Sequence, residues 1–122
     1  MERIWLDNYP PGVPADINPN EIPSLQALIE RSFAKFPERP AYTMLDRTLT
    51  FADLDRLSRQ FAAYLQQVAG LRKGDRIAIM LPNVLQYPVT IVGALRAGLT
   101  IVNTNPLYTP RELEHQLKDS GA

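Results

Sequence analysis

The sequence has no cysteine, a single histidine and no net charge. Without cysteine there are no disulfides and no thiol catalysis, and His115 alone cannot supply the ligands of a zinc centre. The 13 basic residues are balanced by 13 acidic ones, whereas nucleic-acid-binding domains usually carry a basic excess. We therefore expect no metal site and no nucleic-acid partner.

The sequence also lacks the glycine-rich loops with which nucleotide-binding domains hold phosphate. Neither G-x-G-x-x-G nor a Walker loop occurs, and the turn Pro82-Asn83-Val84 has no glycine. A self-sufficient dinucleotide-binding or P-loop domain is therefore not expected. The longest apolar stretch, Val89 to Leu95, is far shorter than the about 20 residues that a membrane-spanning helix needs.

A strand–helix–strand unit lies between Lys73 and Asn105. A short apolar run over Arg76–Leu81 predicts a strand, which Pro82 stops. A helix is predicted from about Leu85 to Ala97, and a second strand over Leu99–Asn103. A unit of this kind has parallel strands and a right-handed crossover. We expect both strands to be buried on both faces, and the helix, which is apolar nearly all round, to be buried on most sides.

Two further helices and a hairpin are predicted before this unit. Ser24 is a typical N-cap for a helix to about Phe36, and Thr50 with Asp53 forms a capping box for a helix to about Val68. Between them, Ala41–Leu45 and Thr48–Thr50 predict a small hairpin. Each helix is expected to bury one apolar stripe. The stripe of the first helix consists of Leu25, Leu28, Ile29, Phe33 and Phe36, and the stripe of the second consists of Leu54, Leu57, Phe61, Leu65 and Val68.

A last helix is predicted from Thr109 to about Asp119. Thr109 and Glu112 form a capping box around Pro110, and Gly121 is a natural stop. His115 falls on the polar side of this helix, where we expect it to be solvated. The other polar residues there indicate a solvent-exposed face: Glu112, Glu114, Lys118 and Asp119. Glu114 and Lys118 are spaced to form an ion pair.

The first part of the chain is rich in proline. Five of the eleven prolines fall before Ser24, and they remove backbone donors and disfavour helix in the preceding residues. We therefore divide the chain into an extended arm, residues 1–23, and an α/β unit, residues 24–122. The arm is predicted to lack regular helix or sheet apart from isolated turns, with Trp5 and Tyr9 as the residues that could anchor it.

Three asparagines follow the two strands of the central unit: Asn83, Asn103 and Asn105. In open α/β sheets, ligands bind beyond the carboxyl ends of the strands. These side chains could therefore form the rim of a cleft completed by further sequence. The alternative is that they cap turns and satisfy loop backbone. From the residues alone we assign no catalytic, cofactor-binding or metal-binding residue.

Several stretches together resemble the acyl-adenylate-forming enzymes. Leu49-Thr50-Phe51-Ala52-Asp53-Leu54 is similar to the first core motif of that superfamily, Leu-Thr-Tyr-x-Glu-Leu, with Phe for Tyr and Asp for Glu. Leu95-Arg96-Ala97-Gly98, followed by Val102 and Asn105-Pro106, resembles the second. Within the superfamily, further stretches of the sequence resemble bacterial long-chain fatty acyl-CoA synthetases. These stretches are Trp5-Leu6, Tyr9-Pro10, Met80-Leu81-Pro82-Asn83, Gln86-Tyr87-Pro88 and Asn105 to Leu113.

This resemblance implies an α/β fold, namely part of the N-terminal subdomain of an adenylate-forming enzyme, with a parallel βαβ core, flanking helices and a small hairpin. It implies a ligase that activates a fatty acid with ATP and Mg²⁺ to an acyl-adenylate and then transfers the acyl group to CoA. The location implied is cytoplasmic, with peripheral attachment to the inner membrane left open.

The catalytic stretches of that superfamily are absent from the sequence, so no catalytic residue is carried over. We expect the chain to be an inert fragment that binds no cofactor and that could associate with itself through apolar surface. Two alternatives stay open: a fragment of another carboxylate–CoA ligase of the superfamily, and a free-standing α/β interaction module.

Overall fold

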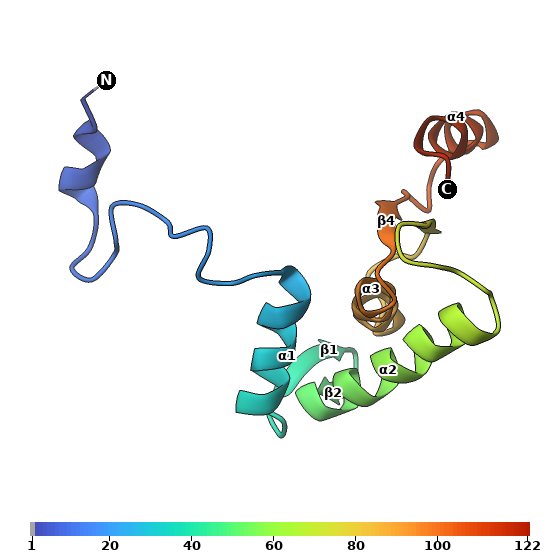
Figure 1. Cartoon of the computed structure of the whole chain (residues 1–122), viewed down its shortest axis with the longest axis horizontal. Helices are drawn as coiled ribbons and strands as arrows, with labels where there is room; N and C mark the ends of the chain where they lie inside the picture. The colour runs from blue at the N-terminus through green and yellow to red at the C-terminus, as the bar shows by residue number, and fades with distance from the viewer. Residues whose placement is uncertain (1) are drawn as a thin grey trace.

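A computed structural model describes residues 2–122 of the chain (Figure 1). It is an α/β structure, in agreement with the fold class predicted from the sequence. In chain order its elements are a 3₁₀ helix η1 (Ile4–Asn8), α1 (Leu25–Lys35), β1 (Pro40–Met44), β2 (Arg47–Thr50), α2 (Phe51–Gln67), β3 (Arg76–Ile79), α3 (Gln86–Arg96), β4 (Thr100–Asn103) and α4 (Pro110–Ser120).

The helix ends are fixed by the caps that the sequence predicts. The Ser24 hydroxyl accepts a hydrogen bond from the Ala27 amide at 3.0 Å, and complete capping boxes open α2 at Thr50 and α4 at Thr109. At the end of α3, Gly98 has a φ of 77°. The Gly98 and Leu99 amides donate back into the last turn of α3, a termination that only a left-handed residue permits.

The strands form two separate two-stranded sheets. β1 and β2 pair antiparallel as the predicted hairpin, and the two-residue turn puts Leu45 at a φ of 52°, unusual for a bulky residue. β3 and β4 pair parallel, with Arg76 opposite Thr100 and Ile79 opposite Asn103. The helix α3 connects them, so the predicted parallel strand–helix–strand unit is confirmed.

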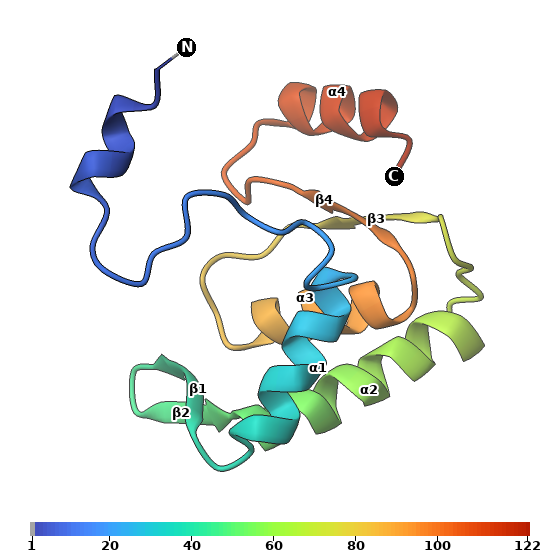
Figure 2. The same cartoon turned by 60° about the vertical axis from the view of Figure 1, so that its left-hand side comes forward.

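The core lies between α2 and α3, the two helices that pack against each other below the β3–β4 pair in Figure 2. Gly93 of α3 packs so closely on α2 that a Cβ there would lie 2.8 Å from the Phe61 ring and 3.0 Å from the Ser58 carbonyl oxygen. Of the residues of α3 only Gln86 is exposed, so this helix is buried on most sides, as predicted. The buried apolar residues are Phe33, Leu54, Ala62, Leu65, Ile79, Val92, Ala94, Ala97 and Leu99.

The prediction that both strands are buried on both faces is wrong for this structure. Ile79 is buried, but Arg76, Thr100 and Asn103 are exposed. The cause is incomplete cover: α3 packs on one face of the β3–β4 pair, whereas α4, on the opposite side, buries none of its residues fully (Figures 1 and 2). Its stripe of Leu113 and Leu117 is only half-buried.

Two residues assigned to the buried helix stripes are exposed. Leu25 is 56% exposed and Val68 is 71% exposed. Both lie at helix ends, Leu25 as the first residue of α1 and Val68 as the C-cap of α2, beyond the reach of the neighbouring helices. Small residues on α2, Ser58 and Ala62, are buried instead because α3 approaches there.

The arm contains one element that the prolines did not lead us to expect, the 3₁₀ helix η1 over Ile4–Asn8. The rest of residues 2–23 forms no helix or strand, and Met1 lies outside the described residues. Trp5 is 46% exposed and Tyr9 is 42% exposed, so neither anchors the arm by deep burial. The division into an arm and an α/β unit stays a prediction.

Candidate functional site

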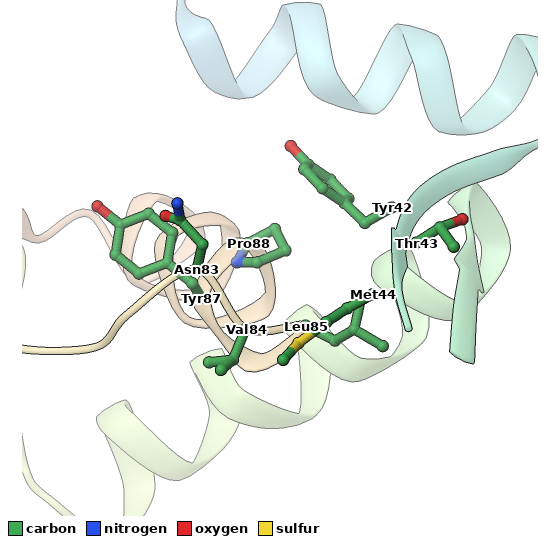
Figure 3. Close-up of a pocket in the computed structure, with 8 residues that line it drawn as sticks. All are labelled: Tyr42, Thr43, Met44, Asn83, Val84, Leu85, Tyr87 and Pro88. Carbon is green, nitrogen blue, oxygen red and sulfur yellow. The ribbon is translucent and has the colours of Figure 1, made fainter. Parts of the chain in front are cut away.

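The carboxyl ends of β3 and β4 lie at one edge of the parallel pair, the place where open α/β sheets bind ligands. Next to the turn after β3 lies a hollow of about 230 Å³ between the β1 strand of the hairpin and the start of α3. Figure 3 shows Tyr42 facing it from one side and Asn83, Tyr87 and Pro88 from the other. The remaining residues that line it are Thr43, Met44, Val84 and Leu85.

The three asparagines of the predicted rim do not share this hollow. Asn83 lines it, but the Asn103 side chain accepts a hydrogen bond from the Tyr87 hydroxyl at 3.0 Å, and the Asn103 carbonyl accepts one from Gln116 at 3.0 Å. The Asn105 side chain accepts from the Leu107 amide at 3.0 Å, as in an Asx turn. Asn103 and Asn105 therefore satisfy loop and strand groups, which was the alternative considered from the sequence.

The lining of the hollow carries no group that is ordinarily charged at neutral pH. It holds hydroxyl, amide and apolar side chains, with no carboxylate, lysine, arginine or histidine among the described residues. Proton transfer at neutral pH needs a group whose pKa lies near the working pH. The lining therefore gives no reason to assign a catalytic residue in this hollow.

A second polar centre surrounds Arg96 in the interior. The Arg96 side chain is only 6% exposed, and it donates from α3 to the Asp55 carbonyl at 2.8 Å, to the Ser58 hydroxyl at 3.0 Å and to the Asp55 carboxylate. The Glu30 carboxylate of α1 lies 3.6 Å from its Nε, and the Phe33 ring lies 5.1 Å from its guanidinium carbon. One side chain thus connects α1, α2 and α3.

The charges around Arg96 change the acidity of Asp55. Burial opposes ionisation of this carboxyl, but the hydrogen bonds from Arg96 and Arg59 outweigh burial and hold the pKa of Asp55 below its ordinary value. Asp55 therefore stays ionised and paired at neutral pH. Its role is to neutralise a buried cation, because an unpaired guanidinium would be costly to bury.

The sequence alone did not reveal this centre. Arg96 falls in the stretch that resembles the second core motif of the superfamily, and nothing in that stretch pointed to Asp55. The available signal was the position of Arg96 on a helix apolar nearly all round, because arginine is almost never buried without a partner. The sequence separation between Arg96 and Asp55 hid which carboxylate that partner is.

The polar residues of α4 lie as predicted. His115 is exposed, and Lys118 pairs with Glu114 one turn away at 2.5 Å. Within residues 2–122, no three histidine, aspartate or glutamate side chains gather in a way that could hold a metal ion. The helices of this same range are too short or too polar for any of them to cross a membrane.

Comparison with known proteins identifies the class of protein. Residues 29–122 match the family described as AMP-binding enzyme, and the chain belongs to this family. The matched range includes α2, α3, both sheets and α4, together with the two stretches that resemble the superfamily's core motifs.

Bacterial ligases are similar to this chain over all or nearly all of its length. It is 56% identical over 122 residues to a long-chain-fatty-acid–CoA ligase of Escherichia coli O157:H7, and 42% identical over 120 residues to one of Bacillus subtilis. The match covers 100% and 98% of this chain. The chain spans 22% and 21% of the length of these two relatives.

Solved structures show the same fold. The N-terminal subdomain of Klebsiella oxytoca NpsA superposes with a TM-score of 0.77 at 24% identity, covering 81% of this chain and 26% of that one. Mycobacterium smegmatis MbtA superposes with a TM-score of 0.74 at 33% identity, covering 80% of this chain and 18% of that one. The fold is therefore part of an adenylate-forming enzyme's N-terminal subdomain, as predicted.

Proposed function

We propose that the chain is the N-terminal part of a long-chain-fatty-acid–CoA ligase. A ligase of this kind works in two steps. In the first step the fatty-acid carboxylate attacks the α-phosphorus of ATP, which releases pyrophosphate and leaves an acyl-adenylate. The thiol of CoA then attacks the acyl carbon, and AMP leaves as the thioester forms. Adenylation is needed because a free carboxylate is a poor acyl donor, and Mg²⁺ would offset the phosphate charge during the first step.

The observation that carries this proposal is the identity of 56% along the full 122 residues with a ligase of that name. A relative with another name, syringomycin synthase SyrB1 of Pseudomonas syringae, is 38% identical over 86 residues and matches 70% of this chain. The likeness to long-chain ligases therefore includes the arm and is stronger. It favours this activity over another member of the family and over a free-standing interaction module.

Within the proposed enzyme this chain acts as scaffold. The stretch resembling the first core motif is the capping box that opens α2, where the Asp53 carboxylate accepts from the Thr50 amide at 3.2 Å and from its hydroxyl at 2.9 Å. The stretch resembling the second is the glycine-terminated end of α3 and the start of β4. We assign the binding of ATP, Mg²⁺ and CoA to the longer protein, and a cytoplasmic location with it.

A chimera tests the proposal. In it, this chain replaces the matched 122 residues of the Escherichia coli ligase, and the purified protein is assayed for ATP- and CoA-dependent thioester formation from palmitate. We expect activity within about tenfold of the parent, since the two segments are 56% identical over 122 residues. The 122-residue chain alone is the control, and we expect it to form no acyl-CoA and to bind Mg-ATP no better than about millimolar.

The chimera also has an outcome that contradicts the proposal. A soluble chimera with the parent's thermal unfolding temperature but no thioester formation would show that this segment does not serve a long-chain ligase. Activity with an aromatic acid in place of palmitate would instead support another carboxylate–CoA ligase of the family.

A further inference from the structure

Basic side chains gather at the end of α1, on the part of this helix that faces solvent. The other side of α1 packs on α2 and α3, as Figures 1 and 2 show. The basic cluster consists of Arg31, Lys35 and Arg39, which are all exposed. In the part of the chain that the structure describes, none of the three takes part in an ion pair.

This arrangement of charge differs from that of the other charged helices. α2 and α4 place acidic and basic side chains three or four residues apart, and these form ion pairs, such as Glu114 with Lys118. In α1, Arg31 and Lys35 are four residues apart, a spacing that brings Cβ atoms to about 5–6 Å. Two cations at this spacing repel each other, whereas an acidic residue at either position would stabilise the helix.

The helix dipole accounts for only part of the basic cluster. The carbonyl end of a helix favours a cation, and Lys35 lies in the last turn of α1. This effect falls off within one turn, and Arg39 lies beyond the end of the helix. The dipole therefore gives no reason for the third cation.

The Phe36 ring fixes where two of the cations lie. The Lys35 Nζ is 5.1 Å from the centre of this ring, and the Arg39 guanidinium carbon is 4.8 Å from it. Arg39 reaches the ring because its amide donates to the Phe36 carbonyl at 3.0 Å, which closes a turn after α1. The two cationic groups are therefore no further apart than the sum of these two ring distances, and cation–π attraction favours their positions.

A hollow of about 370 Å³ opens beside this ring, and it is lined by Arg31, Ser32, Lys35 and Phe36. This volume falls in the range of about 300–1,000 Å³ that is typical of small-molecule sites. The Ser32 hydroxyl donates to the Leu28 carbonyl at 3.1 Å, so the free donors of the lining are those of the two cations. Among the described residues, no carboxylate lines the hollow.

Two acidic residues are next to the basic cluster in the sequence. Glu30 accepts a hydrogen bond from Gln26 at 3.1 Å and lies 3.6 Å from the Arg96 Nε, so its carboxylate is engaged elsewhere. Glu38 is exposed and forms no ion pair with any residue from 2 to 122. The basic cluster therefore keeps a net positive charge even when Glu38 is counted.

We propose that the basic cluster binds a phosphate group that carries more than one negative charge. Two guanidinium forks and an ammonium group supply donors for several phosphoryl oxygens, and a bound dianion removes the repulsion between the cations. A soluble diphosphate and the headgroup of phosphatidic acid both carry such a group, so both are tested. This site is separate from the proposed ligase activity and does not depend on it.

Titration of the 122-residue chain with inorganic pyrophosphate, followed by the NMR shifts of its backbone amides, tests the site. The buffer contains no Mg²⁺ and about 10 mM salt, at which the Debye length is about 30 Å. We expect saturable shifts within residues 31–39 and a Kd of about 1 mM, since exposed ion pairs are individually weak. Arg31→Gln and Lys35→Gln should each weaken binding about threefold. Lys35→Glu, which places a carboxylate between the two arginines, should weaken it more than about tenfold.

Two control variants show whether the position of the charge matters. Arg31→Lys keeps the charge and should retain most of the affinity. Arg72→Gln removes an exposed arginine outside the basic cluster and should leave pyrophosphate binding unchanged. All the replaced side chains are exposed, so each variant should keep the amide spectrum of the folded chain.

A sedimentation assay distinguishes the two sources of phosphate. Vesicles of phosphatidylcholine alone are compared with vesicles that also contain phosphatidic acid. Binding only to the second kind, abolished by Lys35→Glu, would assign the basic cluster to a lipid headgroup. Pyrophosphate binding without vesicle binding would assign it to a soluble phosphate compound. We expect this second result, because the cations surround one hollow and one ring rather than a broad flat face.

Three results would overturn the proposal. The first is the absence of pyrophosphate shifts together with vesicle binding that is absent or unaffected by Lys35→Glu. The second is a set of pyrophosphate shifts spread over the exposed basic residues of the whole chain. The third is equal loss of pyrophosphate affinity in the Lys35→Gln and Arg72→Gln variants, which would mean that overall charge and not this cluster attracts the anion.

Discussion

At the scale of single residues, Arg96 connects more of the fold than any other charged side chain described above. Its guanidinium reaches carboxylates on α1 and α2 while its chain packs in the interior. The Arg96 Nε is buried without a hydrogen-bond partner among residues 2–122, and a carboxylate oxygen of Glu30 lies 3.6 Å from it. A buried charge of this kind stabilises the fold only while its partners stay in place.

We predict that Arg96→Met lowers the free energy of unfolding by about 2–4 kcal/mol. Methionine can fill the volume, but the Asp55 carboxylate, which is 29% exposed, then loses its principal partner. The matched control is Arg59→Met, which removes the other arginine paired with Asp55 at 3.0 Å. Its side chain is 66% exposed, so the cost should stay under about 1 kcal/mol. Urea denaturation measures both, and equal losses would contradict the argument.

At the scale of elements, the helices and strands could be predicted because local signals fix them. Thr50 and Thr109 begin their helices through capping boxes, and Gly98 and Gly121 end theirs at positive φ. These signals depend on residues close in sequence, so the boundaries agree with the structure to within about two residues. The 3₁₀ helix in the arm carries no comparable signal and was missed.

What the sequence could not show is which elements face each other. The burial of Leu25 and Val68 was overestimated because helical periodicity gives the direction of a face but not how far the neighbouring helix extends. The hollow next to the turn after β3 was missed for the same reason, since its residues come from β1 and from the region where α3 starts. The Arg96–Asp55 pair likewise depends on the crossing of two helices.

That crossing depends on one glycine. We predict that Gly93→Ala lowers the free energy of unfolding by about 1–3 kcal/mol, although alanine favours helix by about 1 kcal/mol. The added methyl group would lie 2.8 Å from the Phe61 ring and 3.0 Å from the Ser58 carbonyl oxygen, so α2 and α3 must separate. Thermal unfolding measures the loss.

A double variant provides the control for this prediction. Gly93→Ala combined with Phe61→Leu removes the ring from the clash and should recover part of the stability relative to the sum of the single changes. A stabilised Gly93→Ala protein would mean that helix propensity outweighs packing here, and would refute the close approach of α2 and α3.

At the scale of the whole molecule, the parallel pair β3–β4 is only partly covered on the face where α4 lies. Parallel sheets normally have both faces covered, yet here α4 buries none of its residues fully. Within residues 2–122 each of these two strands pairs with only one neighbour, so each has one open edge. The chain spans 22% of the length of its Escherichia coli relative, and the rest of such a protein is a natural source of cover for these surfaces.

We therefore predict that the 122-residue chain associates with itself through the β3–β4 edges. An open strand edge accepts another strand, and apolar side chains left in water each forgo roughly 1.5–3 kcal/mol. Light scattering after size exclusion, at several concentrations, should show a dimer that dissociates on dilution. Thr100→Lys places a charge on an exposed position of β4 and should shift the chain toward monomer. Leu45→Lys, at the 88% exposed hairpin tip, should not. A chain that stays monomeric at every concentration, or that responds equally to both lysines, would count against pairing at this sheet.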